Sequence, residues 1–95
     1  MSTLKAFWEA APEYLEAKEQ VLAWYRHTLH ADWSSPADVK IDFKSASILK
    51  DGRVVFNIAG NKYRLVVWIN YSYRVVYIRF IGTHAQYDKI DVQTI

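Results

Sequence analysis

Apolar residues recur with two different periods along this chain, and the change of period divides it into two halves. Residues 4–11 and 12–30 repeat their apolar positions at the spacing of a helix face. From residue 45 onward, apolar and polar residues alternate, which places them on opposite faces of strands. Helices followed by an antiparallel meander predict an α+β domain with helices on one face of the sheet.

The first half predicts two main helices and a shorter one. The first covers residues 4–11, and the second begins at Pro12 and ends near residue 29 or 30. Leu15, Leu22 and Leu29 repeat every seven residues and are expected to form the packed stripe of the second helix. Ser35-Pro36 has the form of an N-cap and first-turn proline, which predicts a short helix through about residue 41.

The second half predicts a sheet of three to four strands. The expected strands, the first of them short, cover residues 45–49, 53–59, 63–70 and 75–81. Asp51-Gly52 between apolar runs is a strong hairpin signal. Residues 63–70 carry bulk on both faces, which indicates a central strand. In the last strand we expect Val76, Ile78 and Phe80 to face the helices, with Tyr77 and Arg79 opposite; a short helix follows at Thr83.

Composition fits one domain spanning residues 1–95. The hydrophobic fraction is 52%, and four tryptophans and seven tyrosines argue against disorder. Cysteine is absent, which excludes disulfides, thiol nucleophiles and thiolate metal sites. The sequence shows no signal peptide, and no window approaches the ~18 apolar residues of a membrane span. We therefore expect a cytoplasmic protein.

Charge is distributed unevenly along the chain. Residues 1–39 carry three basic and six acidic side chains, a net charge of −3, whereas residues 40–95 carry nine and four, a net charge of +5. This asymmetry fits a polyanion bound by the second half, although ordinary variation in a small protein can also produce it.

Basic residues in the strand region are spaced for phosphate binding. Lys62 and Arg64 are two residues apart and leave one face of a strand together, and Arg79 and Tyr77 can share that face from the next strand. Guanidinium groups match phosphate oxygens in pairs and stay charged at physiological pH. Arginines on the outer face of a sheet also serve solubility alone.

His84 is the candidate general acid or base. Thr83 and Gln86 have the spacing of a capping box, which puts His84 at the first helical position. A helix N-terminus disfavours a cation, whereas Asp88, one turn on, stabilises imidazolium. A neutral imidazole beside a phosphate can take the proton of a ribose 2′-hydroxyl. Tyr87, on the same side of that helix, can stack on a base, bond a phosphate or pack on the sheet.

Other candidate residues carry weaker signals. Tyr71 and Tyr73 lie at a turn, where they can stack on unpaired bases or pair across the hairpin. His27 and His30 have helical spacing, but no third ligand is near, so we expect no metal and no cofactor.

Taken together, these motifs resemble the HigB-type toxins of bacterial toxin–antitoxin pairs. The resemblance is carried by residues 55–64, by Tyr77-Ile78-Arg79, and by Thr83-His84 with Tyr87-Asp88-Lys89. Residues 4–9 and 31–38 resemble the helical half of the same family, so the likeness covers nearly the whole chain. Such toxins generally begin with a short strand, for which Met1-Ser2-Thr3 leaves little room.

The resemblance implies a RelE-like fold and cleavage of messenger RNA, usually on the ribosome, with growth arrest as the outcome. We expect this cleavage to be independent of metal. It also implies a cognate HigA-like helix-turn-helix antitoxin. The residues expected in catalysis are His84, Arg64, Arg79 and Lys62. Those expected to bind substrate are Tyr87, Asn61, Tyr77 and Tyr73.

Two other functions use the same sequence features. A non-catalytic RNA- or ribosome-binding module needs the basic face but no acid–base group, and it would block translation by occupancy. A protein-interaction domain would engage a partner through the acidic helices, with no affinity for RNA.

Overall fold

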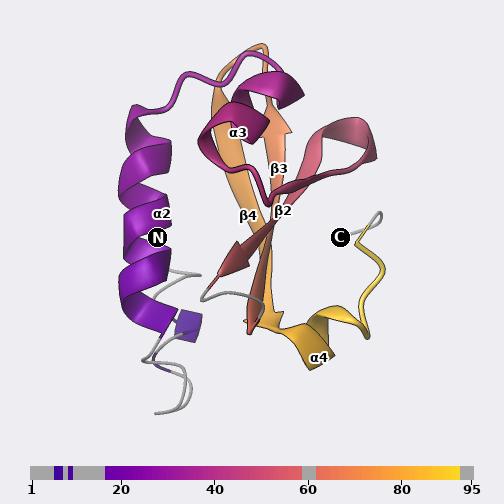
Figure 1. The fold of residues 1–95 in the computed structure, drawn as a ribbon. Coiled ribbons are helices and arrows are strands. Elements are labelled where there is room, and N and C mark those ends of the chain that lie inside the picture. The colour runs from indigo at the N-terminus through magenta and orange to yellow at the C-terminus, as the bar shows by residue number, and fades with distance from the viewer. Residues whose placement is uncertain (1–5, 8, 10–16, 59–61, 93–95) are drawn as a thin grey trace.

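The computed structural model describes residues 6–7, 9, 17–58 and 62–92. Its four strands form one antiparallel sheet in the order β1-β2-β3-β4, with bounds Ser47–Ile48, Arg53–Ile58, Tyr63–Asn70 and Val75–Thr83. The helices are α2 at Lys18–His30, α3 at Pro36–Asp42 and α4 at His84–Tyr87. Helix α2 lies along one face of the sheet, and α4 lies at one end of the other face (Figure 1). This arrangement confirms the predicted α+β fold.

The N-terminal helices agree with the prediction where the structure describes them. Ala6, Phe7 and Glu9 are helical, and α2 ends at His30 as expected. The predicted start of the second helix at Pro12 and the proposed lack of an initial strand lie outside the described residues. Phe7 packs edge-on against Tyr63 at the start of β3, with ring centroids 5.4 Å apart.

The buried face of α2 differs from the predicted leucine stripe. Ala17, Val21 and Trp24 are buried at spacings of four and three residues, which is one face of a 3.6-residue helix. Leu29 is 62% exposed, and Leu22 is only partly buried. The expectation for Leu29 was wrong because α2 meets the sheet through the face of Ala17, Val21 and Trp24. At about 100° per residue, Leu22 and Leu29 lie more than about 90° around the helix from the middle of that face.

The hydrophobic core lies between α2 and the sheet. Alternate residues of β2 and β3 point toward the helix and are almost completely buried: Val54, Phe56, Ile58, Tyr63, Leu65, Val67 and Ile69. The period of two explains this selection, because successive side chains leave opposite faces of a strand. The intervening residues form the second face of the sheet.

An aromatic cluster attaches the connector and α3 to this core. Trp33 stacks on Phe56 at 6.1 Å, and Phe43 meets Phe56 edge-on at 5.1 Å. The carboxylate of Asp42 accepts hydrogen bonds from His27 Nε2 at 3.0 Å and from Trp33 Nε1 at 2.8 Å. These two donors, His27 first, lower the pKa of Asp42, so one ionised carboxylate links α2, the connector and α3.

The first hairpin forms where Asp51-Gly52 predicted it. Asp51 has φ 59° and Gly52 has φ 81°, and the N–H of Leu49 donates to the carbonyl of Arg53 at 2.8 Å. Glycine suits this turn for a second reason, since a Cβ at Gly52 would lie 2.6 Å from the carbonyl oxygen of Ile69.

Strand β4 contains a β-bulge that the sequence did not reveal. Val66 pairs with Phe80, but the next residue, Val67, pairs with Ile78, which leaves Arg79 as the extra residue. Val76 and Ile78 pack on the core as predicted, and after the bulge Ile81 does so. The prediction for Phe80 was wrong because the bulge shifts the alternation by one residue. The strand also continues to Thr83 rather than ending at residue 81.

Within the described residues, no helix is long and apolar enough to cross a membrane.

The core position of Leu65 provides a test of this packing. Leu65 is fully buried in the central strand, so Leu65→Ala should lower the free energy of unfolding by about 2–5 kcal/mol. Urea denaturation followed by circular dichroism measures the difference. Leu29→Ala removes the same atoms from a side chain that is 62% exposed and should have a much smaller effect. Equal losses from the two variants would contradict the assignment of the core.

Candidate active site

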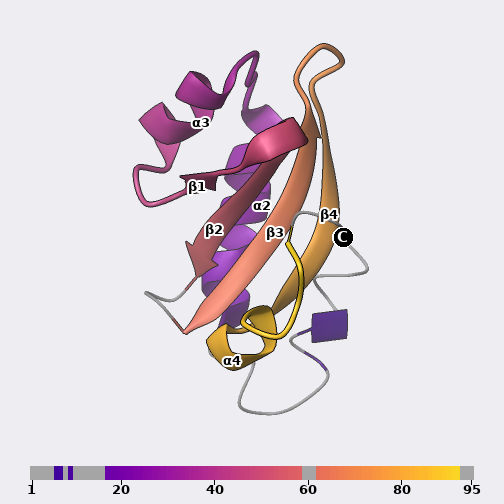
Figure 2. The same ribbon diagram turned by 90° about the vertical axis from the view of Figure 1, so that its right-hand side faces the viewer.

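The face of the sheet opposite α2 carries the other half of the alternation, which mixes apolar and charged residues. On β3, Arg64, Val66 and Trp68 alternate with core residues and therefore leave this second face. Figure 2 looks onto this face, with α4 at its lower end and the residues after α4 passing in front of the strands. We refer to it below as the open face.

Helix α4 is fixed to the start of β3 by backbone and cap hydrogen bonds. Thr83 Oγ1 accepts from the N–H of Gln86 at 3.2 Å, and Gln86 Oε1 accepts from the N–H of Thr83 at 2.9 Å. This confirms the predicted capping box. The N–H of His84 donates to the carbonyl of Lys62 at 3.1 Å. His84 is thereby held next to the residue that precedes β3.

His84 is paired with an acidic side chain from its own helix. Its Nδ1 lies 3.0 Å from Oδ2 of Asp88, and both side chains are about half exposed. Among the residues that the structure describes, none forms a hydrogen bond with Nε2 of His84. The imidazole is accessible to solvent and held on one side by a carboxylate.

Arg64 lies beside α4, as the sequence predicted for a common site. Its guanidinium carbon is 5.9 Å from the ring centroid of Tyr87, a cation–π contact. In the sheet, Arg64 is directly opposite Gly82. Because Tyr87 is three residues after His84 on α4, Arg64 contacts the same short helix that presents the imidazole.

Lys62 completes this group at the start of β3. It is exposed and two residues before Arg64, and its carbonyl receives the His84 N–H. Arg64, His84, Tyr87 and Lys62 therefore gather at one end of the open face; we call them the basic cluster.

Arg79 and Tyr77 lie further along the same face. The guanidinium carbon of Arg79 is 5.8 Å from the Tyr77 ring, and that ring stacks on Trp68 at 5.2 Å. Arg79 is three residues before Gly82, which corresponds to about 10 Å of strand. The structure therefore places Arg79 about 10 Å along the strand from the basic cluster, with its side chain near Tyr77.

The structure does not bring every predicted residue to the basic cluster. Tyr73 is 78% exposed in the turn between β3 and β4, at the far end of the hairpin from α4 (Figure 2). The eight residues of β3 separate it from the basic cluster by about 25 Å. Asn61 lies outside the described residues.

Two residues of this region, Trp68 and Gly82, were not predicted from the sequence. Trp68 is paired with Tyr77 across the strands, and its Nε1 donates to the carbonyl of Asp51 at 2.7 Å. The alternation of residues 63–70 contained a signal for Trp68, because it shares a face with Arg64. The sequence contained no such indication for Gly82, because its position opposite Arg64 depends on the bulge in β4.

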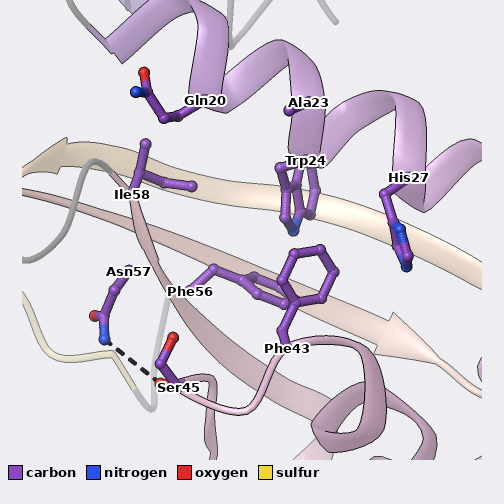
Figure 3. Close-up of a pocket in the computed structure, with 9 residues that line it drawn as sticks. All are labelled: Gln20, Ala23, Trp24, His27, Phe43, Ser45, Phe56, Asn57 and Ile58. Carbon is purple, nitrogen blue, oxygen red and sulfur yellow. Dashed lines mark hydrogen bonds between the residues drawn. The ribbon is translucent and has the colours of Figure 1, made fainter.

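Two cavities lined by described residues lie away from the basic cluster. One of about 370 Å³ opens between α2 and β2 and is lined by Trp24, Phe43 and Phe56, with Asn57 bonded to the Ser45 carbonyl at its edge (Figure 3). Its described lining contains no lysine or arginine. A second, of about 430 Å³, opens between α2 and β4. Both lie on the helix-covered side of the sheet, and the basic cluster lines neither.

The remaining titratable residues mainly hold segments together. Arg74 Nε bonds Asp32 at 2.7 Å and fixes the β3–β4 turn to the connector. His27 bonds Asp42, and no group of three His, Asp or Glu side chains suited to a metal occurs among the described residues.

Comparison with known proteins gives one consistent result. Residues 17–90 match the family described as HigB_toxin, a RelE-like toxic component of a toxin-antitoxin system. The chain is 32% identical over 88 residues to the mRNA interferase toxin HigB of Escherichia coli (strain K12), an alignment that covers 90% of this chain and 85% of that protein. It is 27% identical over 86 residues to the mRNA interferase HigB of Escherichia coli O6:H1, covering 88% and 84%.

The position of α4 depends on the small size of Gly82, which can be tested. A Cβ at Gly82 would lie 2.5 Å from Gln86 Oε1 and 2.7 Å from Cζ of Phe80. Gly82→Ala should therefore displace the Gln86 side chain from its cap hydrogen bond and destabilise the protein by about 1 kcal/mol.

A double-mutant cycle with Gln86→Ala, measured by thermal unfolding, separates this effect from others. If Gly82→Ala acts through the cap, the double variant should be little less stable than either single variant. Fully additive losses would show that Gly82 matters for another reason.

Proposed function

Because the chain belongs to the HigB family of RelE-like toxins, the toxic components of toxin–antitoxin systems, we propose that it arrests growth by cleaving messenger RNA. The relatives named mRNA interferase align over most of both chains. The observation that carries the proposal is the basic cluster, in which the Arg64 guanidinium contacts Tyr87 on the same short helix that begins with His84.

The reaction we propose is transesterification within the RNA strand. The 2′-hydroxyl attacks the adjacent phosphorus as its proton is removed, and the bond from phosphorus to the 5′-oxygen breaks. The products are a 2′,3′-cyclic phosphate and a 5′-hydroxyl, which takes up a proton. The route needs an acid–base group and cations for the developing charge, and the side chains of this face supply both without a metal.

His84 is the residue we assign to proton transfer. Its imidazole is half exposed beside the start of β3, so a phosphate bound there would be within reach. Arg64 is assigned to the phosphate, because its guanidinium is held next to α4 by Tyr87 and can bind two oxygens at once.

The remaining assignments extend the site along the strands. Lys62 adds a point charge at the start of β3. Tyr87 orients the substrate against Arg64, and Arg79 with Tyr77 would hold the strand of RNA beyond the cleaved bond. The guanidinium over the Tyr77 ring and the neighbouring Trp68 present a stacked surface of the kind that accepts unpaired bases.

The partners follow from the same proposal. The substrate is messenger RNA on the translating ribosome, which places the toxin in the cytoplasm. A HigA-like antitoxin with a helix-turn-helix would neutralise it.

Cleavage by the purified chain and its variants tests the site. His84→Ala should lower the rate by about 10²–10⁴-fold, and Arg64→Ala by about 10²–10³-fold. Primer extension on a defined transcript, with and without ribosomes, maps and quantifies the cuts. Arg79→Ala should weaken RNA binding more than it slows the cleavage step.

Matched controls come from exposed residues of α2. His30→Ala and Arg26→Ala remove the same side-chain types on the other side of the sheet and should leave cleavage unchanged. Full cleavage by His84→Ala and Arg64→Ala would remove the site assignment. Growth arrest without cleaved transcripts would instead favour a module that blocks translation by occupying RNA or the ribosome.

A further inference from the structure

Asp88 is an acidic side chain paired with the proposed acid–base group, and the function assigned so far does not use it. Its Oδ2 lies 3.0 Å from Nδ1 of His84, a hydrogen-bonding distance. Asp88 follows directly after α4 as its C-cap residue, and its own N–H donates to the carbonyl of His84. Backbone and side chain therefore both connect residue 88 to residue 84.

The geometry specifies which ring nitrogen faces the carboxylate. An ionised carboxylate can only accept a proton in a hydrogen bond, so its charge 3.0 Å away favours the imidazole form that carries a proton on the nitrogen facing it. For a neutral imidazole this places the single proton on Nδ1 and leaves the lone pair on Nε2. Among the described residues, no hydrogen bond to that Nε2 is found, and it is the nitrogen that we assign to the substrate.

We propose that Asp88 is a positioning residue for His84: its carboxylate holds the imidazole in the Nδ1–H tautomer and orientation in which Nε2 accepts the 2′-hydroxyl proton. The inference rests on the proposed function, because it assigns Asp88 a role through His84.

A plain surface ion pair is the competing explanation. Pairs at i and i+4 on exposed helices contribute little to stability, so a loss of stability cannot distinguish the two. The position of the proton can, because an ordinary exposed imidazole is not forced into the Nδ1–H form.

Nitrogen chemical shifts of the purified, ¹⁵N-labelled full-length chain report the tautomer directly. Long-range ¹H–¹⁵N correlation spectra, recorded at a pH where the ring is neutral, should show His84 mainly protonated on Nδ1. Asp88→Ala should move the population to Nε2–H. A wild-type ring that is mainly Nε2–H, or one that Asp88→Ala leaves unchanged, would overturn the inference.

Cleavage kinetics provide the functional half of the test. Asp88→Ala should lower kcat by about 10–100-fold with little change in KM, since a misplaced base slows only proton transfer. Asp88→Glu should recover part of the rate. In the His84→Ala background, Asp88→Ala should have no further effect. Glu19→Ala, which removes an exposed carboxylate from α2, should leave the rate unchanged.

The two proposals fail in different ways. Full activity of His84→Ala would remove the acid–base assignment whatever the tautomer. A strong defect in His84→Ala, with a normal rate in Asp88→Ala, would keep the assignment of His84 and overturn the role of Asp88.

Discussion

The register of β3 against β4 is the constraint on which the rest of the candidate site depends. Arg64 is opposite Gly82, Tyr63 is opposite Thr83, and the N–H of His84 donates to the carbonyl of Lys62. The chain therefore leaves β4 and enters α4 beside the beginning of β3. Buried neighbours fix this register, because a slip of one residue would turn Arg64 into the core and the apolar residues beside it to the solvent.

The bulge at Arg79 determines which residues at the end of β4 face the core and which lie on the open face. Without the extra residue, Gly82 would face the core and Ile81 would lie on the open face. With it, Ile81 packs on the core and Phe80 is on the open face. Gly82 is opposite Arg64 and leaves room for Gln86 and the Phe80 ring. The same irregularity turns Arg79 toward Tyr77 and Trp68. One inserted residue thus positions both ends of the proposed RNA-binding surface.

Local patterns in the sequence were sufficient for most of the fold. The Asp51-Gly52 turn, the start of α3 at Pro36 and the capping box of Thr83 each depend on a few neighbouring residues, and each formed as predicted. The alternation of residues 63–70 identified the central strand and placed Arg64 outside the core. The wrong predictions concern contacts between segments. The bulge depends on how β4 pairs with β3. The burial of Trp24 in place of Leu29 depends on where α2 meets the sheet.

The candidate site could be predicted only in part for the same reason. The spacing of Lys62 and Arg64 and the cap before His84 are local features. The contact of Arg64 with Tyr87, and of His84 with Lys62, depends on the pairing of β3 with β4. Tyr73 shows the limit of residue type as a guide, since an exposed aromatic residue in a turn lies at the far end of the same strands. The apolar cavities beside α2 lie on the other side of the sheet from the basic cluster.

The most direct test of the central claim is a structure of the chain bound to a short RNA that carries a 2′-O-methyl group at the cleavage site and cannot react. The account predicts one phosphate in contact with the Arg64 guanidinium, with the blocked 2′-oxygen next to Nε2 of His84. RNA bound along α2, or a phosphate at the cleavage site that reaches neither side chain, would contradict it.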